Sequence, residues 1–176
     1  MRVYITDLEA YNNGHLVGRW VTLPMDGDLL AECVEDILKE GKNICEDEHF
    51  HEEYFITDFE CEYLDIGEYD NLERLNEIAE AMEDIDEDGI KAIKFLLDNN
   101  FVSDIFQAIE CYEDNVRIYE DSTMEDIAES FIEECYNLDD MPSIIANNID
   151  YASIARDMEI EGSFYFVDGD IYEYIG

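Results

Sequence analysis

The chain has 176 residues, of which 48 are acidic and nine are basic, so its formal net charge is −39. Hydrophobic residues still make up 47% of the sequence, with twelve Tyr, nine Phe and one Trp. This content excludes a disordered acidic tail, which lacks the aliphatic and aromatic residues that form a core. The charge excludes a protein that binds nucleic acid or an anionic membrane, because both kinds bind through Lys and Arg.

Residues 1–62 are expected to form a small α+β domain. Polar and apolar residues alternate, as in strands, over 2–5, 19–23 and 54–59. One helix is predicted between the second and third strands, with Asp26 or Asp28 as its N-cap. Its apolar face consists of Leu30, Cys33, Val34, Ile37 and Leu38.

Residues 63–103 are expected to form a helical domain, because the apolar residues recur at helical spacing. Asp70 or Asn71 is predicted to cap the first helix and Asp86 the second. The first apolar stripe consists of Leu72, Leu75, Ile78, Ala79, Met82 and Ile85, and the second of Ile90, Ile93, Leu96 and Leu97.

Residues 104–176 are expected to form a second α+β domain. The pattern predicts a helix at 105–109, a strand at 116–119, and one or two helices between Pro142 and about Glu159. Ser122 and Glu125 have the spacing of a capping box that opens another helix. The predicted buried face of that helix consists of Met124, Ile127, Ala128, Phe131 and Cys135. Asp168-Gly169 lies between two aromatic-rich alternating runs and predicts a terminal hairpin.

Acidic residues line the polar faces of several predicted helices. Between Ile118 and Ala155 there are ten acids and no Lys or Arg. Like charges four residues apart on a helix cost about 0.2–0.5 kcal/mol per pair, so an acidic face repeated in every domain suggests a function for the charge. The candidate surface consists of Glu73, Glu77, Glu80, Asp84, Asp86, Glu87, Asp88, Glu120, Asp121, Glu125, Asp126, Glu129, Glu133, Glu134, Asp139 and Asp140.

The charge density suggests a protein that stands in for DNA. Duplex DNA carries one charge per roughly 1.7 Å, so 39 charges correspond to about 66 Å, or ~20 base pairs. Small, strongly charged domains are expected to be arranged end to end, which gives an elongated chain. Two other interpretations remain open: a halophilic or cation-buffering protein without a macromolecular target, and an acidic chaperone of the histone-binding type.

Two segments resemble metal sites without fitting one. Asp84, Asp86, Asp88 and Gly89 have the spacing of a calcium loop, but Phe95 occupies the position of the bidentate Glu, which favours an acidic helix start. The spacing of Cys45, His49, His51 and Cys61 is not a standard zinc pattern, and the two histidines are expected to be exposed in an acidic loop.

Catalytic motifs are also missing from the sequence. It contains no nucleophile elbow, phosphate-binding glycine loop or HExxH motif. No enzyme activity, metal or cofactor is therefore expected. Five scattered cysteines and the lack of an N-terminal apolar segment indicate a reduced, cytoplasmic protein.

Two stretches of the chain follow the pattern of a known family. The first, VYITDLEAYNNGHLVGRWVTLP, matches at Tyr4, Tyr11, Asn12, Gly14, Gly18 and Trp20. The second contains MEDIAESFIEEC and MPSIIANNIDYASIARDMEIEGSFYF, with matches at Pro142, Ile149-Asp150-Tyr151, Arg156-Asp157, Gly162 and Phe164. Together and in this order they resemble the ArdA family of antirestriction proteins, whereas residues 39–53 depart from the family pattern.

The resemblance implies an elongated DNA mimic of three domains that inhibits type I restriction-modification enzymes. Such a protein occupies the DNA-binding groove of the enzyme and binds neither nucleic acid nor membrane itself. The resemblance further implies a homodimer joined through the C-terminal domains and a gene carried on mobile genetic elements.

Overall fold

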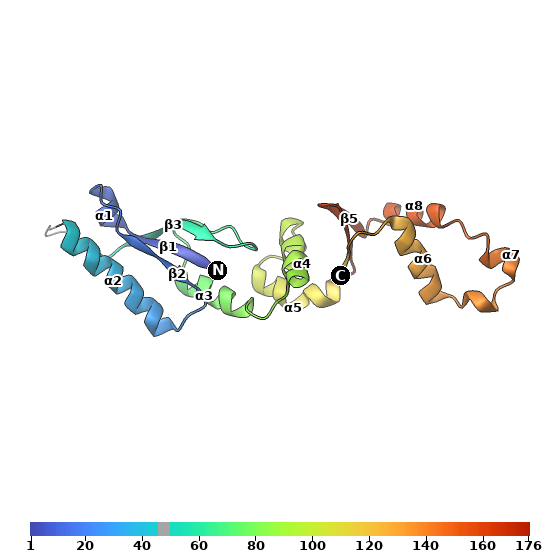
Figure 1. Ribbon diagram of the computed structural model, residues 1–176, viewed down its shortest axis with the longest axis horizontal. Helices are drawn as coiled ribbons and strands as arrows, with labels where there is room; N and C mark the ends of the chain where they lie inside the picture. Colours follow the sequence, from blue (N-terminus) through green and yellow to red (C-terminus); the bar gives the residue numbers. More distant parts are fainter. Residues whose placement is uncertain (46–49) are drawn as a thin grey trace. The chain divides into compact units, whose positions relative to one another are not determined.

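The computed structural model describes residues 1–45 and 50–176 of the chain. The chain forms two compact units, Met1–Ile109 and Glu110–Gly176. Helices and two small antiparallel sheets are present, which confirms the α+β fold class (Figure 1). The division into three domains at 1–62, 63–103 and 104–176 stays a prediction.

A three-stranded antiparallel sheet of order β2-β1-β3 lies in the first unit. Its strands are β1 (Arg2–Asp7), β2 (Gly18–Thr22) and β3 (Tyr54–Glu60). All three predicted strands are therefore confirmed, with ends within two residues of the expected ones. Val3 lies opposite Val21 on one side and Phe59 on the other, so these side chains share one face of the sheet.

Helix α2 (Gly27–Cys45) packs against this apolar face (Figure 1). Leu30 and Ile37 are buried in the core, as the predicted stripe requires. Of the two candidate caps, Asp26 is the N-cap: its Oδ1 accepts the backbone N–H groups of Asp28 at 2.9 Å and Leu29 at 3.3 Å.

A short helix that the pattern did not predict, α1 (Leu8–Asn12), follows β1 directly. Asp7 is its N-cap and accepts the backbone N–H of Ala10 at 2.8 Å. Five residues are too few to show a helical repeat of apolar positions, so the hydrophobic pattern cannot indicate this helix.

Three helices complete the first unit and lead into the second: α3 (Leu72–Ala81), α4 (Glu87–Asp98) and α5 (Ile105–Asn115). Leu72, Leu75 and Ala79 lie in the same core as the sheet. Asn76 attaches α3 to the chain before α2, because its side-chain amide donates to the carbonyl of Met25 and accepts its N–H.

The predicted caps in this region are confirmed, but the first helix is shorter than its apolar stripe. Asn71 caps α3 and Asp86 caps α4. The segment that resembles a calcium loop is the start of α4: Asp86 accepts the N–H of Gly89 at 2.9 Å, and Gly89 lies inside the helix. Helix α3 ends at Ala81, so Asp84 and Ile85 lie beyond it.

The second unit contains a sheet of order β4-β6-β5 and a pair of packed helices. Its elements are β4 (Val116–Tyr119), α6 (Met124–Cys135), the 3-10 helix η1 (Leu138–Asp140), α7 (Ser143–Ala146), α8 (Tyr151–Glu161), β5 (Phe164–Val167) and β6 (Asp170–Tyr174). Met124, Ile127 and Ala128 of α6 form a core with Ala155 of α8 and Ile171 of β6.

The predicted hairpin and strand are confirmed. Strands β5 and β6 pair through a turn at Asp168 and Gly169, whose φ angles are 52° and 103°. A turn of this kind requires positive φ at both positions, which explains the Asp-Gly pair. Strand β4 pairs with β6 on its other side.

Two predictions about α6 were wrong. The capping box is formed by Thr123 and Asp126, not by Ser122 and Glu125, because the helix begins one residue later. Phe131 and Cys135 are not buried: Phe131 is 48% exposed, and Cys135 is exposed as well. Of the residues of α6, only those in its first half are buried in the core of the second unit.

Candidate functional site

All sixteen carboxylates of the candidate surface are exposed. In the first unit, Glu73, Glu77 and Glu80 lie on α3, opposite its buried stripe. Asp84 and Asp86 follow in the turn, and Glu87 and Asp88 form the first turn of α4. The structure therefore places these residues on α3 and on the following turn into α4.

In the second unit, helix α6 has the longest acidic face. Glu125, Glu129 and Glu133 are spaced at i, i+4, which corresponds to about 6 Å along the helix axis. Glu134 lies about 100° around the helix from this row, on the side of Ile127 and Phe131. Glu120 and Asp121 precede the helix, and Asp139 and Asp140 follow it in η1.

The two acidic regions differ in their compensation by cations. Lys91 on α4 lies 3.3 Å from Asp88 and 4.0 Å from Glu87. By contrast, none of the ion pairs among the described residues involves Glu125, Glu129 or Glu133 of α6, and the cations nearest in sequence, Arg117 and Arg156, lie on β4 and α8. The field at α6 is therefore the less compensated of the two.

Two carboxylates of the second unit have pKa values below the usual range. The Thr123 hydroxyl donates to Asp126 at 2.5 Å and the Thr123 N–H at 2.8 Å, and these bonds lower the pKa of Asp126. The Ser153 hydroxyl lowers the pKa of Asp150 in the same way, with a smaller contribution from the charge of Arg156. Both groups are ionised at neutral pH: Asp150 is the N-cap of α8, and Asp126 is the N3 residue of the capping box of α6.

The second unit also exposes many large apolar side chains. Phe166 is 64% exposed, Ile160 75% and Ile144 78%. Tyr136, Ile145 and Ile175 are exposed as well, together with Phe131. Large exposed apolar surfaces are typical of regions that contact another macromolecule.

The prediction of an exposed histidine was wrong for His51. Its side chain is 1% exposed, and its Nδ1 lies 2.6 Å from Oδ2 of Asp7, which is 0% exposed. His49, the other histidine of that segment, lies outside the described residues. Among the residues that the structure describes, no three His, Cys, Asp or Glu side chains form a group that could hold a metal ion.

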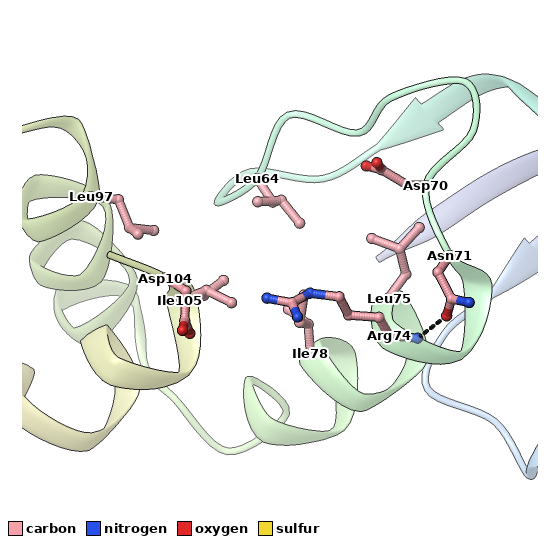
Figure 2. A pocket seen from close by; sticks show the side chains of 9 residues that line it. All are labelled: Leu64, Asp70, Asn71, Arg74, Leu75, Ile78, Leu97, Asp104 and Ile105. Carbon is pink, nitrogen blue, oxygen red and sulfur yellow. Dashed lines mark hydrogen bonds between the residues drawn. The ribbon is translucent and has the colours of Figure 1, made fainter. Parts of the chain in front are cut away.

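A cavity of about 270 Å³ in the first unit was not indicated by the sequence pattern (Figure 2). Its walls come from α3, from the loop before it, from the end of α4 and from the start of α5. The guanidinium of Arg74 lies 5.6 Å from the ring centroid of Phe106. The two residues are 32 positions apart, so only the tertiary fold brings them together.

Fold and surface define a small acidic α+β protein whose exposed helix faces carry carboxylates and whose second unit exposes apolar side chains. The family model described as antirestriction protein (ArdA) matches residues 3–173. The chain therefore belongs to the ArdA family of antirestriction proteins, which are inhibitors and not a known family of enzymes. A search of curated proteins finds no match.

Within residues 1–45 and 50–176, no helix is both long and apolar enough to cross a membrane.

Proposed function

We propose that this protein is a DNA mimic that inhibits type I restriction-modification enzymes by occupying their DNA-binding groove. The observation that carries the proposal is the uncompensated row of exposed carboxylates on α6, in a chain that belongs to an antirestriction family. The carboxylates replace phosphates and pair with the Lys and Arg side chains that otherwise contact DNA.

The proposed inhibition is electrostatic and shared among many groups. An exposed ion pair contributes about 0–1 kcal/mol, so tight binding requires many carboxylates acting together. The long-range field also accelerates the encounter with a basic groove. Inhibition should therefore weaken steeply as the salt concentration rises.

The protein is further proposed to act as a cytoplasmic homodimer joined through its second unit. The exposed apolar side chains of that unit, such as Ile160 and Phe166, provide a surface that a second copy can cover. At ~20 base pairs per chain, two chains would correspond to about 40, which suits an enzyme with a bipartite recognition site.

The experiment is competition with labelled DNA for a type I methyltransferase at low and at high salt. The first variant is Glu129→Gln, which should inhibit almost as well as the parent. The second converts four exposed acids of α6 to amides and keeps Asp126, because it caps the helix. Its substitutions are Glu125→Gln, Glu129→Gln, Glu133→Gln and Glu134→Gln.

At low salt, the fourfold variant should lose up to about 4 kcal/mol of binding free energy, at about 0–1 kcal/mol for each of the four pairs. A matched control removes the same number of charges from exposed positions outside the candidate surface. Its substitutions are Glu32→Gln, Asp36→Asn, Glu52→Gln and Glu53→Gln. A collapse of inhibition in the Glu129→Gln variant would indicate a discrete site, and equal potency of the parent and the α6 variant would contradict mimicry by this face.

A further inference from the structure

The cavity in the first unit combines apolar walls with an acidic rim. Five aliphatic side chains line it: Leu64, Leu75, Ile78, Leu97 and Ile105. Two carboxylates, Asp70 and Asp104, stand at its edge (Figure 2). Both already accept backbone N–H groups, Asp70 from Gly67 at 2.8 Å and Asp104 from Phe106 at 2.8 Å.

Arg74 is the cation of this cavity. Its side chain extends from α3 across the space towards the start of α5 (Figure 2). No carboxylate of the described residues lies within 4.0 Å of its guanidinium, although the chain contains 48 acids. Its ring contact with Phe106 holds it at one wall of the cavity, and its N–H donors remain available for an incoming acceptor.

Size and charge restrict what can occupy the cavity. At about 270 Å³, it is smaller than the ~300–1,000 Å³ of typical cofactor and ligand sites. A second copy of this chain is disfavoured at this rim, because its nine basic residues offer few cations to face Asp70 and Asp104. The complementary occupant is an apolar side chain that stands between basic residues of another protein.

We propose that this cavity binds one protruding apolar side chain of the basic protein that the acidic surface contacts. The aliphatic walls bury the side chain, Asp70 and Asp104 face its basic neighbours, and Arg74 donates hydrogen bonds to the backbone carbonyl beside it. The inference rests on the proposed function and identifies a contact that a phosphate backbone does not offer. Burial of the apolar side chain adds a component of affinity that does not depend on salt.

The first experiment is the same competition assay, repeated over a series of salt concentrations. Leu97→Trp fills the cavity from a half-buried wall position, and Leu29→Trp is its control on an exposed position of α2. Filling the cavity should raise the concentration for half-inhibition about tenfold at every salt concentration, as for the loss of an interface anchor. The salt dependence should not change, and Leu29→Trp should behave like the parent.

Arg74→Gln gives a test of opposite sign. Removing a positive charge should strengthen a purely charge-driven inhibitor, and Lys94→Gln, an exposed cation outside this cavity, should do so slightly. If Arg74 contacts the partner backbone, Arg74→Gln should instead weaken inhibition about three- to tenfold, as expected for a lost hydrogen bond. Improved inhibition in both variants would overturn the proposal, and this holds even if Leu97→Trp fails to fold.

A direct titration separates this inference from the proposed function. N-acetyl-L-leucinamide supplies an apolar side chain and a backbone carbonyl, and it should cause saturable shifts in the methyl NMR signals of Leu97 and Ile105. These shifts should be lost in Arg74→Gln. If the parent inhibits and the cavity variants inhibit equally well, the proposed binding in the cavity is refuted and the proposed function is not. A parent that does not inhibit refutes the proposed function, and non-saturating shifts then overturn the cavity site too.

Discussion

The two units of the chain bury their apolar residues to different extents. The main core of the first unit contains eleven buried side chains from a sheet, two helices and the loops beside them, whereas the core around α6 and α8 contains five. The first unit also has seven of the nine basic residues, and ion pairs such as Arg2–Glu60 and Arg19–Glu40 connect its separate elements. The second unit has only Arg117 and Arg156.

The difference indicates a division of roles. The first unit has the larger core and the ion pairs that connect separate elements, so its stability depends mainly on internal contacts. The second unit has a smaller core beside exposed apolar side chains such as Ile160 and Phe166, so its surface suits contact with partners. Substitutions that disturb packing should act mainly in the first unit, and substitutions that disturb association mainly in the second.

The largest expected effect concerns the buried pair of Asp7 and His51 in the first unit. Asp7→Ala should lower the free energy of unfolding by about 3–5 kcal/mol, because it removes one partner of a buried pair and the cap of α1. Urea denaturation followed by the fluorescence of Trp20 measures this unit. Asp26→Ala, at an exposed cap, should cost only about 1 kcal/mol. Equal losses would show that the buried pair adds no stability.

A smaller loss is expected at Gly41, which lies in α2 against the same pair. A Cβ at this position would overlap Oδ2 of Asp7 and lie 3.0 Å from Nδ1 of His51. Gly41→Ala should therefore cost about 1–3 kcal/mol in the same denaturation measurement. Gly27→Ala adds a Cβ in open space at the start of the helix and should cost nothing. A Gly41→Ala variant as stable as the parent would mean that Asp7 and His51 can shift without a loss of stability.

The next prediction concerns association through the second unit. Phe166→Asp should weaken self-association at least about tenfold without unfolding the unit, because the ring is 64% exposed. Leu16→Asp is the control, since this side chain is 69% exposed but lies in the first unit. Sedimentation velocity measures both. Loss of association in the Leu16 variant alone would reverse the comparison of the two units.

The smallest effect concerns pH and the cap of α6. The hydrogen bonds from Thr123 keep the pKa of Asp126 below its ordinary value of about 3.9. The carboxylate therefore contributes stability above that pH, and the contribution is lost as the pH falls through the depressed pKa. Asp126→Asn should accordingly be less stable than the parent at pH 7 but not at strongly acid pH.

Hydrogen exchange of the α6 amides measures this difference. Glu129→Gln removes the same charge without a cap, so its difference from the parent should not follow the pKa of Asp126. If the difference in amide exchange between the parent and Asp126→Asn is independent of pH, the ionised carboxylate of Asp126 does not stabilise the helix.

Much of the fold could be predicted because its elements carry local signals. Alternation revealed the strands, the helical period revealed α2, α3 and α6, and Asp168-Gly169 revealed the final turn. The cap of α6 shows the limit of such signals. Ser122 and Thr123 each have an acid three residues later, and only the observed helix start distinguishes them.

Features that depend on tertiary contacts could not be predicted. The spacing of apolar residues shows which face of α6 is apolar, but not how far its neighbours extend, so the exposure of Phe131 and Cys135 was missed. Asp7 and His51 lie 44 residues apart and meet only because β1 and β3 are neighbours. The exposure of the acids of the candidate surface, by contrast, follows from their chemistry, because burial of an unpaired carboxylate costs free energy.

The turn at Asp168 and Gly169 fixes the length of the chain at that point. Side chains alternate between the two faces of β6, so Ile171 and Tyr172, both buried, lie on opposite faces. A shift of β6 by one residue would exchange the faces of the two side chains and turn Ile171 away from the core. Because β6 lies between β4 and β5, both neighbours would lose their register at once. The turn should therefore accept other residues that adopt positive φ, such as Asn and Gly, but no insertion or deletion.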